Sequence, residues 1–119
     1  YPGTGAASET GAGNIVNAPL PPGAGGEEFR EAFEDRILPA LDRFAPELVI
    51  VSAGFDAHER DPLASLELVE ADFAWATSVL MERADRFAGG RLVSVLEGGY
   101  DLKALAGSVA AHVGTLMGR

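Results

Sequence analysis

Two short runs that consist almost entirely of apolar residues, the second interrupted only by Ser94, are the clearest feature of the hydrophobic pattern. The first lies at residues 48–51 and the second at residues 92–96, and neither shows a regular alternation with charged residues. Runs of this length are typical of strands that are buried on both faces of a parallel sheet. Three longer segments repeat apolar residues at helical spacing around these runs. The pattern predicts the order helix, strand, helix, strand, helix, which is typical of a layered α/β sheet with right-handed crossovers.

The limits of the three helices follow from glycine, proline and capping signals. The first helix begins near Glu27, bends at Pro39 and ends before the first strand. A Gly-Gly pair at residues 89–90 ends the second helix, and Asp101 caps the third. The apolar positions of the three helices are Phe29, Phe33, Ile37, Leu41 and Phe44; Val69, Phe73, Ala76, Leu80, Ala84 and Phe87; and Leu102, Leu105, Val109, Val113 and Leu116. Residues 1–26, rich in glycine and proline, are expected to form loops.

Composition narrows the class of protein. The formal net charge of −9 argues against a protein that binds nucleic acid through phosphates. The chain has no cysteine, which excludes disulfides and thiolate metal sites. No apolar run is long enough to cross a membrane and no signal peptide opens the chain, so a cytoplasmic location is the default expectation. The chain starts at Tyr1 and has few elements to cover two buried strands, so we expect residues 1–119 to be the C-terminal part of one larger domain.

Two side chains that could take part in catalysis or metal binding follow the two predicted strands. Asp56 comes after the first strand, and Tyr100 comes after the second and directly follows Gly98 and Gly99. The carboxyl ends of parallel strands meet at one edge of a sheet, where ligands bind in α/β proteins. Asp56 is either a metal ligand or a turn residue that accepts hydrogen bonds from nearby amides. Tyr100 is either a donor to a developing oxyanion or a half-buried turn residue.

The two histidines and Glu97 are weaker candidates. The spacing of Asp56 and His58 suggests a pair of metal ligands, but the charged residues that follow favour a loop position for His58. His112 has no acidic or histidine partner at helical spacing and is interpreted as structural. Asp61, before a proline, is expected to accept from the local backbone. Glu97 is either a second polar wall of the site or a buried carboxylate.

Four sequence motifs resemble those of the zinc-dependent histone deacetylase family. They are Gly-Phe-Asp-Ala-His at residues 54–58, Asp-Pro-Leu at 61–63, Leu-Glu-Gly-Gly-Tyr-Asp at 96–101 and Tyr-Pro-Gly-Thr-Gly at 1–5. The resemblance extends over nearly the whole chain and is strongest to class II-like and bacterial members, including acetylpolyamine amidohydrolases and acetoin-utilisation proteins. It implies the C-terminal part of a parallel-sheet, three-layer αβα domain of the arginase and deacetylase type.

The resemblance also implies roles for single residues. Asp56 matches a ligand of the catalytic Zn²⁺, or of another divalent metal in its place. Tyr100 matches the catalytic tyrosine that donates a hydrogen bond to the substrate carbonyl. Four further positions match residues of the acyl-substrate tunnel: Tyr1, Leu63, Gly98 and Gly99. The implied reaction is metal-assisted hydrolysis of an acetylated lysine, an acetylated polyamine or another small amide.

The family's other metal ligands and its general-base histidine match no residue of this chain. We therefore expect the isolated chain to be inactive and the activity to belong to the full-length protein. Two alternatives stay open at this point. One is an arginase-like ureohydrolase, whose dinuclear manganese site needs Asp-x-Asp where this chain has Asp56 and His58. The other is a non-catalytic binding module whose site has decayed.

Overall fold

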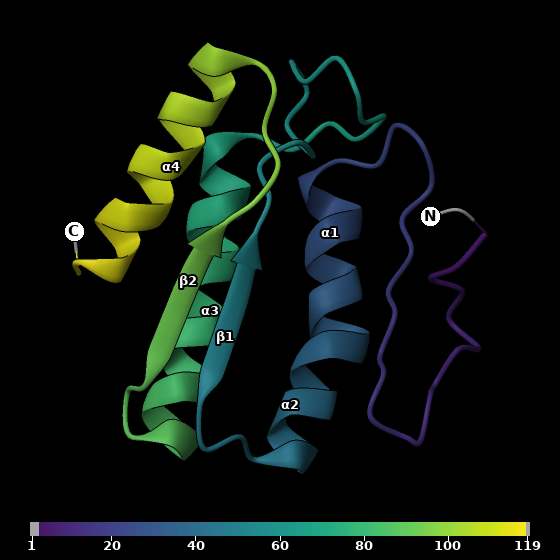
Figure 1. Ribbon diagram of the computed structural model, residues 1–119, viewed down its shortest axis with the longest axis vertical. Helices are drawn as coiled ribbons and strands as arrows, with labels where there is room; N and C mark the ends of the chain where they lie inside the picture. The colour runs from purple at the N-terminus through teal and green to yellow at the C-terminus, as the bar shows by residue number, and fades with distance from the viewer. Residues whose placement is uncertain (1–2, 119) are drawn as a thin grey trace.

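Two parallel strands form the centre of the structure, a computed structural model that describes residues 3–118. Strand β1 (Val49–Ala53) pairs with β2 (Leu92–Leu96), and the register runs from Val49 opposite Leu92 to Ala53 opposite Leu96. Helix α3 (Glu70–Ala88) connects the strands, α4 (Leu102–Leu116) follows β2, and the first helical segment precedes β1 (Figure 1). The element order expected from the hydrophobic pattern is confirmed, as is the α/β class.

The first helical segment consists of two α-helices with a π-helical turn between them. Helix α1 (Gly26–Ala32) leads into the π-helical turn η1 (Phe33–Ile37), which continues as α2 (Leu38–Phe44). The Leu38 N–H donates to the carbonyl of Phe33, five residues back. Pro39 has no N–H and its ring would clash with a carbonyl in the preceding turn of a regular helix. The wider turn accommodates this proline. The disturbance that we expected at Pro39 therefore takes the form of a π-helical turn.

Helix α2 ends at a residue with unfavourable backbone geometry. Ala45 has φ 51° and lies in the left-handed region, where glycine is the usual residue. We expect Ala45→Gly to raise the free energy of unfolding by about 0.5–1 kcal/mol, because it removes a Cβ clash. Ala40→Gly, inside α2, should lower it by about 0.5–1 kcal/mol. Urea unfolding of both variants checks this, and a loss of stability in Ala45→Gly would contradict the left-handed geometry.

The other helix ends agree with the sequence signals. Gly89 ends α3 with φ 57°, and the Asp101 carboxylate accepts a hydrogen bond from the Ala104 N–H at 2.8 Å at the start of α4. The start of α3 has an apolar N-cap, Val69. Asp72 compensates for it, since its carboxylate accepts from the Val69 N–H at 3.0 Å. None of the helices within residues 3–118 has the length and apolarity that crossing a membrane would require.

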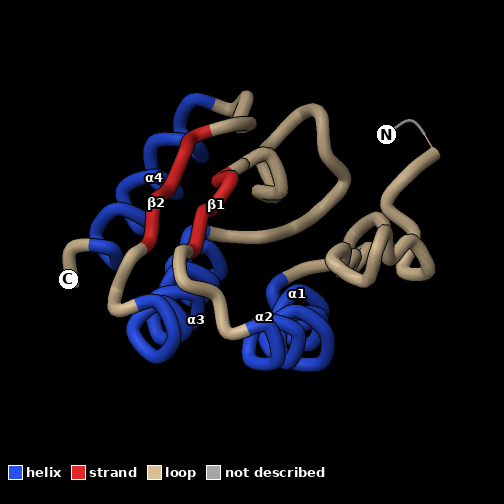
Figure 2. Tube along the Cα trace, turned by 60° about the horizontal axis from the view of Figure 1, so that its bottom comes forward, coloured by secondary structure: helices blue, strands red, loops and turns tan. Residues whose placement is uncertain are grey.

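Only one face of the two-stranded sheet is covered by the described residues. Helix α3 packs against this face, where Val49 contacts Ala84 and Ala88, and Figure 2 shows α3 and the first helical segment on the same side of the strands. On the opposite face Ile50 is 65% exposed and Val93 50% exposed. Within residues 3–118 the strands are therefore covered on one face only, as the small number of elements in this chain led us to expect, and burial on both faces stays a prediction for a larger domain.

The buried face of α4 also differs from the expectation. Leu102 and Val113 are exposed, although the helical pattern placed them in the core. The buried positions are the smaller or more polar Ala104, Ser108 and His112. These residues recur at every fourth position, and Ala104 and Ser108 are small enough to let α4 approach its neighbours closely. Leu105 and Val109, beside this stripe, still pack against the core cluster around Phe55, as expected.

His112 joins three elements through a buried hydrogen-bond network. Its Nδ1 lies 2.6 Å from the Thr77 hydroxyl on α3, and its Nε2 lies 2.8 Å from the Ser94 hydroxyl on β2. The Thr77 hydroxyl donates its hydrogen to the Phe73 carbonyl, so it accepts from Nδ1–H, and Nε2 accepts from Ser94. This agrees with the structural interpretation of His112.

The burial of His112 predicts a pH dependence of stability. Desolvation lowers the pKa of the imidazole below its ordinary value of 6.5. The unfolded chain therefore binds a proton more readily than the folded chain, and stability should fall as the pH drops below 6.5. Urea midpoints of wild-type protein and His112→Asn, compared between pH 7.5 and 5.5, check this. The wild type should lose more stability on acidification than the variant, and equal losses would contradict the expectation.

Candidate active site

The carboxyl ends of β1 and β2 stay paired beyond the strands. The Glu97 N–H donates to the Ala53 carbonyl at 2.9 Å, and the Phe55 N–H donates to the Gly98 carbonyl at 2.8 Å. The loop that carries Asp56 and the loop that carries Tyr100 therefore leave the sheet side by side. This is the arrangement that the sequence led us to expect at the edge of a parallel sheet.

The carboxylate of Asp56 lies in a space that two glycines leave open. A Cβ atom at Gly98 would lie 2.8 Å from the Asp56 Cγ, and a Cβ at Gly54 would lie 2.9 Å from its Oδ1. Atoms at such distances overlap, so any side chain at Gly98 would force the carboxylate to move. The glycine of the second loop thus sets the position of the carboxylate of the first.

Asp56 has no hydrogen-bond partner among residues 3–118. Its carboxylate is partly exposed, and no described N–H or side chain donates to it. A turn-forming aspartate would accept from amides one or two residues away, as Asp61 does here. The alternative in which Asp56 serves its own turn therefore has no support in the geometry. The carboxylate is free to bind a ligand from outside this part of the chain.

Tyr100 is held by its backbone and not by its side chain. Its N–H donates to the Asp61 Oδ2 at 2.8 Å, and Tyr100 as a whole is 56% exposed. The other oxygen of the same carboxylate, Oδ1, accepts from the Leu63 N–H at 2.9 Å. Leu63 itself is 70% exposed. One aspartate thus connects the backbone of two predicted site residues.

The carboxyl group of Asp61 is buried, and it is nevertheless ionised. Burial by itself raises the pKa of its carboxyl, but backbone N–H groups oppose this and keep the pKa below its ordinary value of 3.8. The donors belong to both loops: Leu63, Tyr100, Ala64 and Asp101. The carboxylate is therefore charged at neutral pH, and both of its oxygens act as acceptors.

The remaining predicted positions have clear but different surroundings. Gly99 has φ 141°, and a Cβ there would lie 2.7 Å from the Leu105 Cδ1, so this position needs glycine. Glu97 is exposed, so the interpretation of a buried carboxylate is wrong; its backbone N–H pairs while its side chain faces solvent. Tyr1, expected in the substrate tunnel, lies outside the described residues.

His58 lies in the loop, as expected, but it is completely buried. Its Nδ1 accepts from the Arg60 N–H at 3.1 Å, and its Nε2 lies 3.4 Å from the Glu70 Oε1. Both ring nitrogens are therefore directed at neighbouring protein groups. This geometry does not support a metal-ligand pair with Asp56, and it makes His58 a support for the loop.

Within residues 3–118, no group of three or more His, Cys, Asp or Glu side chains could hold a metal ion. The donor chemistry at the strand ends nevertheless fits zinc in part, because an unpartnered carboxylate oxygen is an acceptable zinc ligand. Asp56 could supply one ligand to such an ion, and residues 3–118 do not supply a complete ligand set.

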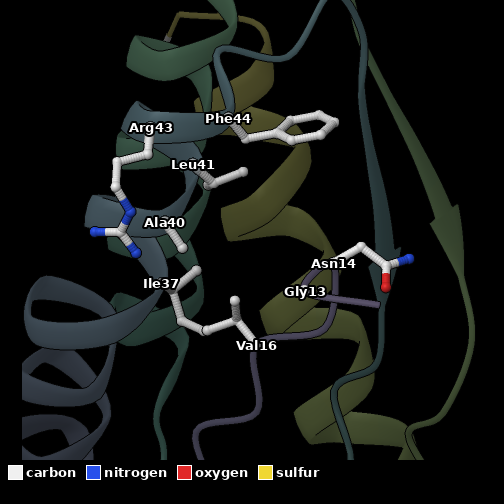
Figure 3. A pocket seen from close by; sticks show the side chains of 8 residues that line it. All are labelled: Gly13, Asn14, Val16, Ile37, Ala40, Leu41, Arg43 and Phe44. Atoms are coloured by element: carbon white, nitrogen blue, oxygen red, sulfur yellow. The ribbon is translucent and has the colours of Figure 1, made fainter. Parts of the chain in front are cut away.

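A large cavity lies away from these strand ends. It has a volume of about 630 Å³ and separates the N-terminal loop from η1 and α2 (Figure 3). Its lining residues are Gly13, Asn14, Val16, Ile37, Ala40, Leu41, Arg43 and Phe44. None of these is a predicted site residue, and none is an acid, a histidine or a nucleophile. The cavity is a groove between a loop and a helix and adds nothing to the chemistry of Asp56.

The long-range bond from Tyr100 to Asp61 was not expected from the sequence. The Asp-Pro pair indicated a turn, and the bond to Leu63 confirms the local part of that prediction. The partner in the second loop lies 39 positions away, and no pattern in a single sequence connects the two. Covariation between these two positions is the signal that could have revealed it.

Comparison with known proteins gives a consistent result. The family model of the histone deacetylase domain matches residues 1–116. Histone deacetylase 10, chloroplastic, of Oryza sativa subsp. japonica is 46% identical over 114 residues, which are 92% of this chain and 26% of that protein. A histone deacetylase-like amidohydrolase of Pseudomonas aeruginosa is 46% identical over 92 residues, which are 77% of this chain and 24% of that protein.

A solved structure agrees with the sequence matches. The crystal structure of the HDA15 HD domain superposes with a TM-score of 0.92 at 38% identity and covers 100% of this chain and 34% of that one. The chain thus spans about a quarter to a third of the relatives it matches. Since the family model covers almost every residue and the fold agrees, the chain belongs to the histone deacetylase family.

Proposed function

We propose that this chain forms the C-terminal part of a larger domain that hydrolyses acetyl-amide bonds with a bound zinc ion. The observation that carries the proposal is the Asp56 carboxylate, which has no partner in residues 3–118 and lies between Gly54 and Gly98 beside the loop of Tyr100. Membership of the histone deacetylase family and similarity to a histone deacetylase-like amidohydrolase support it.

Each residue then has a separate task. Asp56 holds the metal, which when bound polarises the acetyl carbonyl and activates water. The Tyr100 hydroxyl donates a hydrogen bond to the oxyanion that develops from that carbonyl. Leu63 contacts the acyl chain, Gly98 leaves room for the Asp56 carboxylate, and Gly99 forms the turn before Tyr100. The tunnel contact that the resemblance implies for Tyr1 stays a prediction. His112 is bonded at both ring nitrogens, and His58 is completely buried with its Nδ1 bonded to the Arg60 N–H, so we assign the general base to a residue outside this chain.

The substrate in this proposal is an acetylated lysine or an acetylated polyamine. The ureohydrolase alternative loses its support, because the family match is to histone deacetylases and His58 is turned toward Arg60 and Glu70. The non-catalytic alternative becomes an outcome of the experiment. The cytoplasmic location stays a prediction.

The experiment uses the full-length protein, purified with and without zinc. Deacetylation is measured on an acetyl-lysine peptide and on acetylated spermidine, with release of acetate as the readout. We expect hydrolysis of at least one of the two, its loss on treatment with a chelator and its recovery when Zn²⁺ is added. The isolated 119-residue chain is expected to be inactive in the same assay.

Two results would overturn the proposal. Zinc-loaded full-length protein that hydrolyses neither amide would favour a binding module. Hydrolysis that persists after complete removal of metal would exclude the zinc mechanism.

A further inference from the structure

The carboxylate of Asp61 is the only described group that ties the Tyr100 loop to the Asp56 loop through a side chain. It is buried, and it accepts from the Tyr100 N–H with one oxygen and from the Leu63 N–H with the other, at 2.8 Å and 2.9 Å. The only chemistry the sequence indicated for Asp61 was a local turn. Its position between two loops raises the question of what it does for the site.

The loop that carries Tyr100 needs an anchor. It contains Gly98 and Gly99, and glycine has more backbone freedom than any other residue. The Tyr100 side chain makes no hydrogen bond or ring contact with another described residue. Its phenol is therefore placed by the backbone alone, and the backbone N–H of Tyr100 is bonded to Asp61.

The anchor is stronger than an ordinary hydrogen bond. An ionised carboxylate accepts shorter and stronger bonds from N–H groups than a neutral oxygen does. Burial of Asp61, at 8% exposure, limits competition by water. The same carboxylate fixes Leu63, so the two residues are held relative to each other and to the loop that begins with Asp56.

We infer that Asp61 is a positioning residue, which holds the Tyr100 phenol and the Leu63 side chain in register with the Asp56 carboxylate. The inference rests on the proposed function. In catalysis Asp61 touches neither the substrate nor the metal, and it acts through Tyr100. A misplacement of a reacting group by about 1 Å can cost about 100-fold in rate, so such an anchor has a large effect.

The test is Asp61→Asn in the full-length protein. Asparagine keeps the size of the side chain but replaces one acceptor oxygen with an NH₂ donor, so it can retain only one of the two backbone bonds. We expect kcat to fall about 10- to 100-fold while KM changes less than about threefold, because the lost interaction serves the transition state. Zinc content should equal that of the wild type, since Asp61 does not hold the metal.

A double-mutant cycle with Tyr100→Phe separates positioning from general damage. Without the hydroxyl there is nothing left to position, so Asp61→Asn should lower kcat by less than about threefold in the Tyr100→Phe background. A matched control is Asp72→Asn, which removes a buried capping carboxylate at the start of α3. It should lower thermal stability and leave kcat unchanged.

The outcomes distinguish this inference from the proposed function. An inactive wild-type protein overturns the proposed function and the inference together. An active wild type with unchanged kcat in Asp61→Asn, or with equal losses in the two backgrounds of the cycle, overturns the inference alone. If Asp61→Asn fails to fold, amide hydrogen exchange of the wild type decides: the Tyr100 amide should exchange slowly despite its exposed side chain, and rapid exchange overturns the anchor.

Discussion

Replacement of Asp56 by asparagine is expected to abolish most of the activity of the full-length protein. The variant keeps the size of the side chain but loses the negative charge that binds a divalent metal. Loss of an outer-shell partner of a metal ligand costs about 10- to 100-fold, so loss of the ligand's own charge should lower kcat/KM by about 1,000-fold or more. The zinc content of the purified variant should fall with it.

This expectation follows from the surroundings of the carboxylate. Asp56 makes no hydrogen bond within residues 3–118, so the substitution breaks no internal hydrogen bond of that region and keeps the size of the side chain. The thermal stability of metal-free protein should therefore change little. Asp85→Asn, at an exposed position on α3, is the matched control and should leave zinc content and activity unchanged. Full activity in Asp56→Asn would refute the assignment of this residue to the metal.

The second large effect is expected for Tyr100→Phe. The variant retains the ring and the backbone N–H that bonds to Asp61, and it removes only the hydroxyl. Loss of one donor to a developing oxyanion typically lowers kcat by about 100- to 1,000-fold. Because the hydroxyl serves the transition state more than the bound substrate, KM should change much less than kcat.

Zinc content and stability provide the controls for Tyr100→Phe. The phenol has no described partner and the residue is 56% exposed, so both quantities should match those of the wild type. If kcat is unchanged while zinc is bound normally, Tyr100 is not the oxyanion donor. If zinc is lost, the variant has altered the metal site and the interpretation of Tyr100 must change.

Local signals in the sequence were sufficient to predict the elements and their ends. Glycine at residue 89 ends α3 and Asp101 caps α4, because both effects depend on residues one to three positions away. The order of the elements also predicted that Asp56 and Tyr100 lie at the same edge of the sheet, because each residue follows a strand. Strand ends and turn glycines are local, and the parallel pairing brings them together.

Features that depend on packing between distant segments could not be predicted in this way. The hydrophobic pattern placed Leu102 and Val113 in the core, but both are exposed, and the buried positions of α4 include the small residues Ala104 and Ser108. Small residues carry little weight in a hydrophobicity pattern, although they decide how closely helices approach. The same limit applies to Asp61, whose second partner is 39 residues away.

Glycine had two roles that the sequence could not separate. Gly98 and Gly99 form a pair in the chain, but the structure gives them different constraints. Gly98 has no room for a Cβ because the Asp56 carboxylate fills it, whereas Gly99 has φ 141° and faces Leu105. Only the structure shows that the first glycine belongs to the surroundings of Asp56 and the second to the turn.

The central claim is that Asp56 binds the catalytic metal, and diffraction at the zinc absorption edge tests it most directly. Crystals of the zinc-loaded full-length protein should show an anomalous peak about 2.0–2.2 Å from a carboxylate oxygen of Asp56, the distance expected for a zinc–oxygen bond. A zinc peak bound by other residues, with the Asp56 carboxylate bonded to nearby amides, would contradict the claim.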